Sequence, residues 1–275
     1  SGYDGDDLDD LLAKLERSGP VSGEPSVPDA PAKAVTKPGD LILLGDHRLI
    51  CGDATDPKTY AALLTEPADC VWTDPPYGVS IVGGTKDALT IENDDLDEAE
   101  LAQLIEAAFN NLIVNTHKGA AWFVAHPGGP LHLIFGKALY DLGVLRQQLI
   151  WVKNSLVFGR SDYHYRHEPI YYGWTPGAAH QEPRDRKQDT VFEVDRPQAS
   201  ADHPTMKPVA LIEAMLRHST HLGDTVLDPF AGSGSTLIAA HNLDRQAAVI
   251  ELDPIYCDVI VKRWEEHTGE TAIRP

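Results

Sequence analysis

The chain has 275 residues, with 42 acidic and 23 basic side chains and a formal net charge of −19 at pH 7. It contains no run of about 18 apolar residues, so we expect no membrane span, and its length suits one large domain with appendages. The three cysteines, Cys51, Cys70 and Cys257, form no metal-type or redox pair, and we expect buried thiols in a reducing, cytoplasmic compartment.

Residues 1–38 are expected to lie outside the main domain, as a short helix followed by a flexible linker. Leucines at positions 8, 11, 12 and 15 fit one short helix. The remainder has prolines at positions 25, 28, 31 and 38 and too few apolar residues to pack. The main domain is therefore expected over residues 39–275.

Alternating strands and helices follow along this domain. A hairpin is predicted over residues 41–51, where Gly45 and Asp46 separate two β-rich runs. Further strands are predicted at 70–73, 120–125, 149–152, 169–174, 225–227 and 247–252. Helices are predicted at 101–112, 208–218, 236–242 and 255–267, the first of them after the capping-box spacing of Asp97 and Glu100. This order predicts an α/β fold, with a parallel sheet covered on both faces.

The first motif that can carry chemistry is Asp74-Pro75-Pro76-Tyr77, directly after a predicted strand. Its prolines stiffen a backbone that presents a carboxylate, a carbonyl and an aromatic ring. An exocyclic amine on adenine or cytosine is a poor nucleophile, because its lone pair is delocalised into the ring. Acceptance of its hydrogens by Asp74 and the Pro75 carbonyl favours a localised lone pair, and Tyr77 can stack on an extruded base. An ordinary strand-ending turn explains the tetrapeptide alone equally well.

The second motif is a glycine-rich turn that leads into a helix, Asp228-Pro229-Phe230-Ala231-Gly232-Ser233-Gly234-Ser235-Thr236. Glycines let the backbone approach a ligand closely at the carboxyl ends of strands. No lysine follows Gly234 as in a triphosphate loop, and Leu237 stands where a dinucleotide fingerprint needs glycine. The turn therefore suits a ligand with a carboxylate and a ribose. Glu251 ends the next strand and can accept hydrogen bonds from ribose hydroxyls; a surface carboxylate is the alternative.

Four strings in this order make the chain resemble the S-adenosylmethionine-dependent DNA amino-methyltransferases whose catalytic motif precedes the cofactor motif. They are Asp74-Pro75-Pro76-Tyr77-Gly78, His203-Pro204-Thr205-Met206-Lys207-Pro208, the turn from Asp228 to Thr236, and Ile250-Glu251-Leu252-Asp253-Pro254-Ile255-Tyr256. The likeness runs from about residue 37 to 267. It implies a Rossmann-like methyltransferase fold, a mixed seven-stranded sheet with helices on both faces in circularly permuted order. Aspartate at position 74, where cytosine-N4 enzymes usually carry serine, implies methylation of adenine N6.

The resemblance also implies roles for other residues. Asp53 would bind the amino group of the cofactor's adenine, and Glu251 its ribose. The pocket would be shaped by the glycine turn, through Asp228, Phe230, Ala231, Gly232 and Gly234. The methionine end of the cofactor would lie near Thr205, Lys207, Ser235 and Thr236, although a surface lysine at a helix start is the alternative for Lys207. This chemistry needs no metal, so the acidic run 87–100 is expected to be a solvated face.

DNA is the expected partner, yet a charge of −19 repels it. Residues 151–210 hold eight basic and eight acidic side chains, so this neutral segment is where we expect a polyanion to approach; chance variation is the alternative. The family's target-recognition region would fall at about 175–202, which is little surface for reading several base pairs and predicts short or relaxed specificity. Candidate DNA-binding residues are Arg160, Arg166, Arg184, Arg186 and Lys187.

One further expectation concerns the loop that directly follows the first motif. The loop at 79–93, with Gly83 and Gly84, is predicted to be mobile and to close over an extruded base.

Three alternative functions stay open: cytosine-N4 methylation, methylation of adenine in RNA, and a non-catalytic nucleic-acid-binding partner with the same fold. Carbon-5 cytosine methylation is disfavoured because no cysteine follows a proline. A homodimer is kept open, and the start of the domain resembles phage-type proteins in which a ParB-like domain precedes such a methyltransferase.

Overall fold

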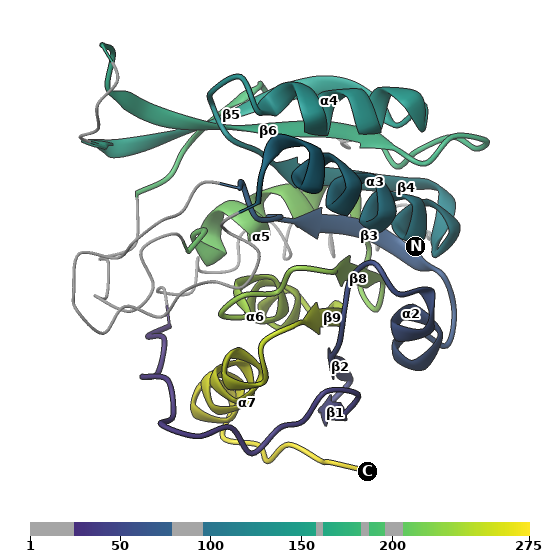
Figure 1. Ribbon diagram of the computed structural model, residues 1–275, viewed down its shortest axis with the longest axis vertical. Coiled ribbons are helices and arrows are strands. Elements are labelled where there is room, and N and C mark those ends of the chain that lie inside the picture. Colours follow the sequence, from purple (N-terminus) through teal and green to yellow (C-terminus); the bar gives the residue numbers. More distant parts are fainter. Residues whose placement is uncertain (1–24, 79–95, 158–161, 183–186, 196–205) are drawn as a thin grey trace, which may run out of the picture.

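The computed structural model describes residues 25–78, 96–157, 162–182, 187–195 and 206–275. Within these ranges, nine strands form one sheet in the order β1-β2-β9-β8-β3-β4-β6-β5-β7. The strands are β1 (Leu41–Leu44), β2 (His47–Cys51), β3 (Ala68–Thr73), β4 (Thr116–Ala125), β5 (Leu145–Val157), β6 (Tyr165–Trp174), β7 (Val191–Glu193), β8 (Thr225–Asp228) and β9 (Gln246–Glu251). Figure 1 shows β1 and β2 toward one end of the sheet and β5 and β6 toward the other.

Helices cover both faces of this sheet. One face packs against three helices, α2 (Pro57–Leu63), α3 (Glu98–Val114) and α4 (His132–Asp141). The opposite face packs against three others, α5 (Val209–Ser219), α6 (Ser235–Asn242) and α7 (Pro254–Thr268). Large side chains fill both layers, including Phe109 and Trp122 on the first face and Trp72 and Trp264 on the second. The Rossmann-like fold with helices on both faces is therefore confirmed.

The central strands determine where a site can lie. β2, β9, β8, β3 and β4 run parallel, so their carboxyl ends meet at one edge of the sheet. β6 runs antiparallel to β4 and to β5, which makes the sheet mixed. The C-terminal end of β5 and the N-terminal end of β6 consequently lie at this same edge.

Local sequence signals produce several elements as predicted. β1 and β2 form the expected antiparallel hairpin. The capping box at the start of α3 is complete: the Asp97 carboxylate accepts hydrogen bonds from the first turn, and the Glu100 side chain accepts one from the Asp97 N–H. Gly234 precedes α6 with a positive φ of 84°, a left-handed conformation that glycine adopts at low cost.

Within the described residues, α2, α4 and β7 were not predicted, and β1 and β7 extend the sheet beyond the seven strands implied by the resemblance. α2 begins with an Asp56 N-cap followed by Pro57, a start signal that the sequence did contain. α4 follows the turn-rich residues 127–130, and no described side chain caps its first turn. β7 has only three residues, too few to show a periodic pattern.

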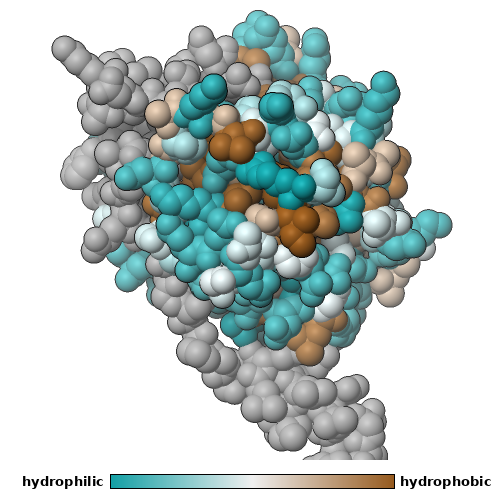
Figure 2. All heavy atoms as spheres, turned by 90° about the horizontal axis from the view of Figure 1, so that it is seen from below, coloured by the Kyte–Doolittle hydropathy of each residue, from teal (hydrophilic) through white to brown (hydrophobic). Residues whose placement is uncertain are grey.

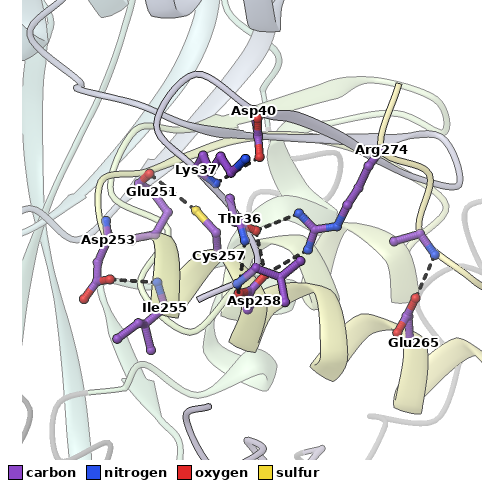
Figure 3. Close-up of polar contacts among 12 residues, drawn as sticks. Thr36, Lys37, Asp40, Glu251, Asp253, Ile255, Cys257, Asp258, Glu265 and Arg274 are labelled. Carbon is purple, nitrogen blue, oxygen red and sulfur yellow. Dashed lines mark hydrogen bonds and ion pairs between the residues drawn. The ribbon is translucent and has the colours of Figure 1, made fainter. Parts of the chain in front are cut away.

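Asp258 in α7 attaches the N-terminal segment to the domain (Figure 3). Its carboxylate accepts hydrogen bonds from the Val35 N–H (2.6 Å) and the Thr36 hydroxyl (2.5 Å), and it pairs with Arg274 (2.8 Å). Thr36 is buried by these contacts. Residues 35–36, expected within a flexible linker, are thus fixed on α7. The helix predicted near residues 8–15 lies outside the described residues, and the domain boundary at residue 38 stays a prediction.

The surface seen from the β1 and α7 end is mainly hydrophilic, with apolar side chains scattered among polar ones (Figure 2). In the described part of the chain, no helix combines the length and the apolar character needed to cross a membrane. Cys51, Cys70 and Cys257 are buried and free, as predicted.

Candidate active site

Asp74 follows β3 at the edge where the parallel strands end, and both its carboxylate oxygens are engaged. Oδ1 accepts a hydrogen bond from the Tyr77 hydroxyl (2.8 Å), and Oδ2 accepts one from the Lys207 ammonium (2.5 Å). The Asp74 side chain is 24% exposed, whereas that of Lys207 is 5% exposed. The carboxylate therefore faces solvent with the cation behind it. Pro75 is buried and Pro76 half-buried, which fixes the backbone between Asp74 and Tyr77.

Two charged residues that were not predicted as site residues complete this cluster. Glu168, in β6, lies 3.1 Å from Lys207 Nζ through Oε2, and its Oε1 pairs with Lys153 of β5. The Lys153 side chain is 6% exposed, and that of Glu168 is 25% exposed. Two partly exposed carboxylates are thus paired with two buried ammonium groups. One signal was available, because each residue directly adjoins a predicted apolar strand.

The charged groups of this cluster shift one another's pKa values. Burial raises the pKa of Asp74, and the adjacent Lys207 opposes that rise. Burial would also raise the pKa of Glu168, but Lys207 and Lys153 outweigh it and hold this pKa at about 2. Burial disfavours a charged Lys207, yet Asp74 and Glu168 raise its pKa overall. Burial and then the Asp74 charge raise the pKa of Tyr77, so its hydroxyl stays protonated and donates to Asp74.

Aromatic side chains continue from this cluster along the same edge. The Tyr77 ring packs edge-to-face on Phe135 of α4, with ring centroids 6.1 Å apart. His126, which follows β4, stacks on Tyr171 at 3.8 Å, and His132 Nδ1 lies 2.8 Å from the Tyr171 hydroxyl. Burial lowers the pKa of His126 to about 4, so this ring is neutral at pH 7. Sequence reasoning missed His126, although it directly follows a predicted strand end.

A hydrogen bond joins this region to the glycine turn. Thr73, the residue before Asp74, donates its hydroxyl proton to Asp228 Oδ1 (2.9 Å). Asp228 also accepts hydrogen bonds from the Phe230 N–H (3.1 Å) and the Thr236 hydroxyl (2.5 Å). Burial raises the pKa of Asp228 to about 6, and these three donors counteract the rise. The two sequence motifs therefore meet, and Asp228 holds the turn from within.

Glu251 lies directly beneath the turn. Its Oε2 accepts a hydrogen bond from the Gly232 N–H (2.8 Å), and its Oε1 accepts one from the Asp253 N–H (2.9 Å). Burial raises the pKa of Glu251 to about 7. Gly232 has a positive φ of 53°, and a Cβ placed there would meet no described atom within 4 Å. The turn thus leaves open space beside an oriented carboxylate.

The remaining predicted cofactor residues of the glycine turn hold the turn against the domain. The Ser235 hydroxyl accepts a hydrogen bond from Arg263 (3.2 Å), and the Thr236 hydroxyl donates to Asp228, so both side chains support the turn from inside. The Ala231 N–H donates to the Ile250 carbonyl (3.0 Å), which ties the turn to β9, and Phe230 packs on the α2–α4 side.

Asp53 lies on the same sheet edge, after β2. It is exposed, and its Oδ1 accepts hydrogen bonds from the Thr55 N–H (2.7 Å) and the Thr55 hydroxyl (2.8 Å). Thr205, Arg160, Arg184 and Arg186 lie outside the described residues, as does the loop predicted at 79–93. Arg166 and Lys187 are exposed, the former at the start of β6. Among the described residues, no three His, Cys, Asp or Glu side chains are arranged to hold a metal ion.

Comparison with known proteins gives a family match over most of this domain. A family model described as DNA methylase (N6_N4_Mtase) matches residues 68–262. The type II methyltransferase M2.DpnII of Streptococcus pneumoniae is 26% identical over 238 residues, which are 76% of this chain and 86% of that relative.

Two solved structures share the fold. The crystal structure of the M1.HpyAVI–SAM complex has a TM-score of 0.60 and 24% identity, covering 78% of this chain and 97% of that chain. The PvuII DNA methyltransferase, which is cytosine-N4-specific, has a TM-score of 0.64 and 15% identity, covering 84% of this chain and 90% of that chain. At these identities the structural likeness shows the fold alone.

Proposed function

The chain belongs to the N6/N4 DNA methylase family, and from that membership we propose that it transfers a methyl group from S-adenosylmethionine to adenine N6 in DNA. The observation that carries this proposal is the 2.9 Å hydrogen bond from Thr73 to Asp228. It joins the residue before Asp74 to the glycine turn. A methyl donor held at the turn would therefore lie beside the carboxylate that accepts the amine.

The turn fits S-adenosylmethionine in its donor and acceptor groups. Glu251 is oriented by two backbone N–H groups, and each of its oxygens keeps a lone pair for a ribose hydroxyl. The open space at Gly232 allows a ligand to approach the backbone closely. Asp53 would bind the adenine amino group, and Lys207 with Thr205 would lie near the methionine end. When bound, this cofactor supplies a methyl group attached to a positively charged sulfur.

Asp74 and the Pro75 carbonyl would activate the substrate amine. Each accepts one N6 hydrogen, which localises the nitrogen lone pair and stabilises the positive charge that develops during attack. The nitrogen gains the methyl carbon, the bonding electron pair stays on sulfur, and one N6 proton is released with Asp74 as the nearest acceptor. Tyr77 would stack on the extruded base, which is worth ~1–3 kcal/mol against an extrusion cost of a few kcal/mol.

Adenine is proposed rather than cytosine because position 74 holds aspartate. The family resemblance implies serine at this position in most cytosine-N4 enzymes. A carboxylate is the stronger acceptor, and here it pairs with a buried Lys207 that favours its charged form. We also propose short or relaxed sequence specificity, since a target-recognition insert confined to about 175–202 would offer little surface against the ~1,000 Å² of a typical specific interface. Methylation mapping of treated genomic DNA tests this; a single motif of about five or more bases contradicts it.

Nucleoside mass spectrometry after methyl transfer to unmethylated DNA tests the proposed reaction. Wild type is expected to form N6-methyladenine, and Asp74→Ala to lower the rate by roughly 100- to 1,000-fold, because the amine loses its charged acceptor. The matched control is Asp141→Asn, which removes an exposed carboxylate paired with Lys137 and should leave the rate unchanged. N4-methylcytosine as the product, or product undiminished in Asp74→Ala, contradicts the proposal.

Calorimetric titration with S-adenosylhomocysteine accompanies this assay. Wild type and Asp74→Ala are both expected to bind it, which would separate a chemical defect from a folding defect. Wild type that fails to bind it contradicts the proposed cofactor.

A further inference from the structure

The cluster around Asp74 has one feature that substrate binding must change. Both Asp74 oxygens accept hydrogen bonds already, from Tyr77 (2.8 Å) and from Lys207 (2.5 Å). The bond from Lys207 is charge-assisted and draws electron density away from the carboxylate. A substrate amine that needs a strong acceptor at Asp74 therefore competes with a buried cation.

Lys207 has a second carboxylate within reach. Glu168 Oε2 lies 3.1 Å from its Nζ and already forms an ion pair with it, and no other described group donates a hydrogen bond to this buried oxygen. A buried charged acceptor gains from a closer and better aligned donor. A small reorientation of the Lys207 ammonium toward Glu168 would strengthen this pair and release Asp74 Oδ2.

We propose that Glu168 is a positioning residue, which draws Lys207 away from Asp74 when the substrate amine binds and so frees Asp74 to accept the amine hydrogen. This inference rests on the proposed function, and it assigns Glu168 no contact with the substrate. The displaced cation never leaves an ionised partner, so no buried charge is left unpaired during the exchange.

Lys153 holds Glu168 in place for this exchange. It is buried, lies on the neighbouring strand β5, and pairs with the Glu168 oxygen that Lys207 does not approach. Lys153 Nζ also lies 5.0 Å from the centroid of the Trp151 ring, a cation–π contact that further restricts its position. Glu168 is therefore anchored through Oε1 and open to Lys207 through Oε2.

The charged and titratable groups that face this exchange come from four elements. Lys153 lies on β5, Glu168 on β6, and Lys207 just before α5, while Asp74 and Tyr77 follow β3. Glu168 raises the pKa of Asp74, whereas Lys207 lowers it. Removing the Glu168 charge is thus expected to lower the Asp74 pKa, both directly and by leaving Lys207 on Asp74.

Single-turnover methyl transfer to unmethylated DNA, measured from pH 5 to 9 on Glu168→Gln, tests the proposal. We expect the plateau rate to fall roughly tenfold or more, and the acid limb of the pH profile to move to lower pH. Affinity for S-adenosylhomocysteine should stay within about twofold of wild type. A plateau within about twofold of wild type, or a fall with no movement of the acid limb, overturns the positioning role.

Two further variants keep the proposal testable if Glu168→Gln fails to fold. Glu168→Asp retains the charge and should restore the wild-type acid limb. Lys153→Met removes a cation that competes for Glu168, so the acid limb should move to higher pH; no movement, or movement to lower pH, overturns the proposal. Failure of the proposed function is recognised separately, because wild type would then form no methylated nucleoside at any pH.

Discussion

The site has a cofactor end, around the glycine turn, and a chemical end, around Asp74, and the two are held by different kinds of interaction. At the turn, Glu251 is held by backbone N–H groups, one of them only 19 residues away, and Asp228 accepts from Thr236 eight residues on. At the chemical end, Asp74 is held by the side chain of Lys207, 133 residues away, and Lys207 is shared with a second carboxylate. A site fixed by its own backbone tolerates side-chain changes, whereas a charge cluster needs every member at once.

Removal of the buried Lys207 ammonium group should affect the chemical end far more than the cofactor end. Lys207→Met leaves two neighbouring carboxylates with one ammonium group, so we expect a loss of about 3–5 kcal/mol in the free energy of unfolding. The acid limb of the rate profile should move to higher pH, because Lys207 no longer lowers the Asp74 pKa. Denaturant unfolding and pH–rate measurements check both effects.

A matched exposed pair provides the control for that variant. Lys137 pairs with Asp141 four residues along α4, and their side chains are 76% and 56% exposed. Lys137→Met should leave the free energy of unfolding close to that of wild type, because an exposed ion pair contributes little. Equal effects of the two substitutions would show that burial does not distinguish the Asp74 cluster.

Glu251→Gln tests the cofactor end. We expect affinity for S-adenosylhomocysteine to fall roughly 10- to 100-fold, since the ribose loses a charged acceptor. In wild type this affinity should rise as the pH passes about 7, because Glu251 must lose its proton to accept both hydroxyls. The Gln variant should lack this dependence, and a pH-dependent affinity that survives in the variant would contradict the role of Glu251.

The same carboxyl group should influence stability with a defined sign. Its pKa is about 7 in the folded protein, against 4.5 for an ordinary solvated glutamate, so the folded state binds more protons between these values. The contribution of Glu251 to stability is therefore lost as pH rises from 4.5 to 7. Wild type should lose stability relative to Glu251→Gln across this interval, and thermal unfolding in matched buffers measures the difference.

Two glycines of the turn allow a finer comparison. Gly232→Ala places a methyl group in open space at a φ of 53°, so we expect a loss of about 1–2 kcal/mol in stability together with weakened cofactor binding. Gly234→Ala has the same backbone strain, and its methyl group would also lie 3.2 Å from Ile260. It should therefore be the less stable variant. Calorimetry that finds unchanged cofactor affinity in Gly232→Ala would place the ligand elsewhere.

The smallest expected effect concerns the hydrogen bond between the two ends. Thr73→Val removes the donor to Asp228 at nearly constant volume, and we expect it to cost about 1–2 kcal/mol of stability. The methyl-transfer rate should fall more than the affinity for S-adenosylhomocysteine, because Asp74 is the residue that Thr73 precedes. An affinity that falls while the rate is retained would reverse this assignment.

The fold was largely predictable because its signals are local. The capping box at Asp97 and the hairpin around Gly45 depend on residues within a few positions of one another, and both are present. The strand β7, at one edge of the sheet, and the helix α4 were missed for the opposite reason. β7 exists only through pairing with β5, and α4 has no capping side chain among the described residues.

Residues of the site that lie close together in the sequence could be predicted, whereas residues brought together by the fold could not. The tetrapeptide from Asp74 to Tyr77 and the turn ending in Gly234 could be read from short strings, and so could Glu251. Glu168 and Lys153 could not, because their role comes from the antiparallel pairing of β5 and β6 and from contact with Lys207. Sequence spacing contains no record of such a contact.

A crystal structure of this chain with S-adenosylhomocysteine and an adenine-containing DNA strand is the most direct test of the central claim. We predict that N6 of an extruded adenine lies about 3 Å from the Asp74 carboxylate, with the cofactor sulfur facing N6 from the glycine turn. An adenine amine beyond hydrogen-bonding reach of Asp74, or a cofactor bound away from Glu251, would contradict the account.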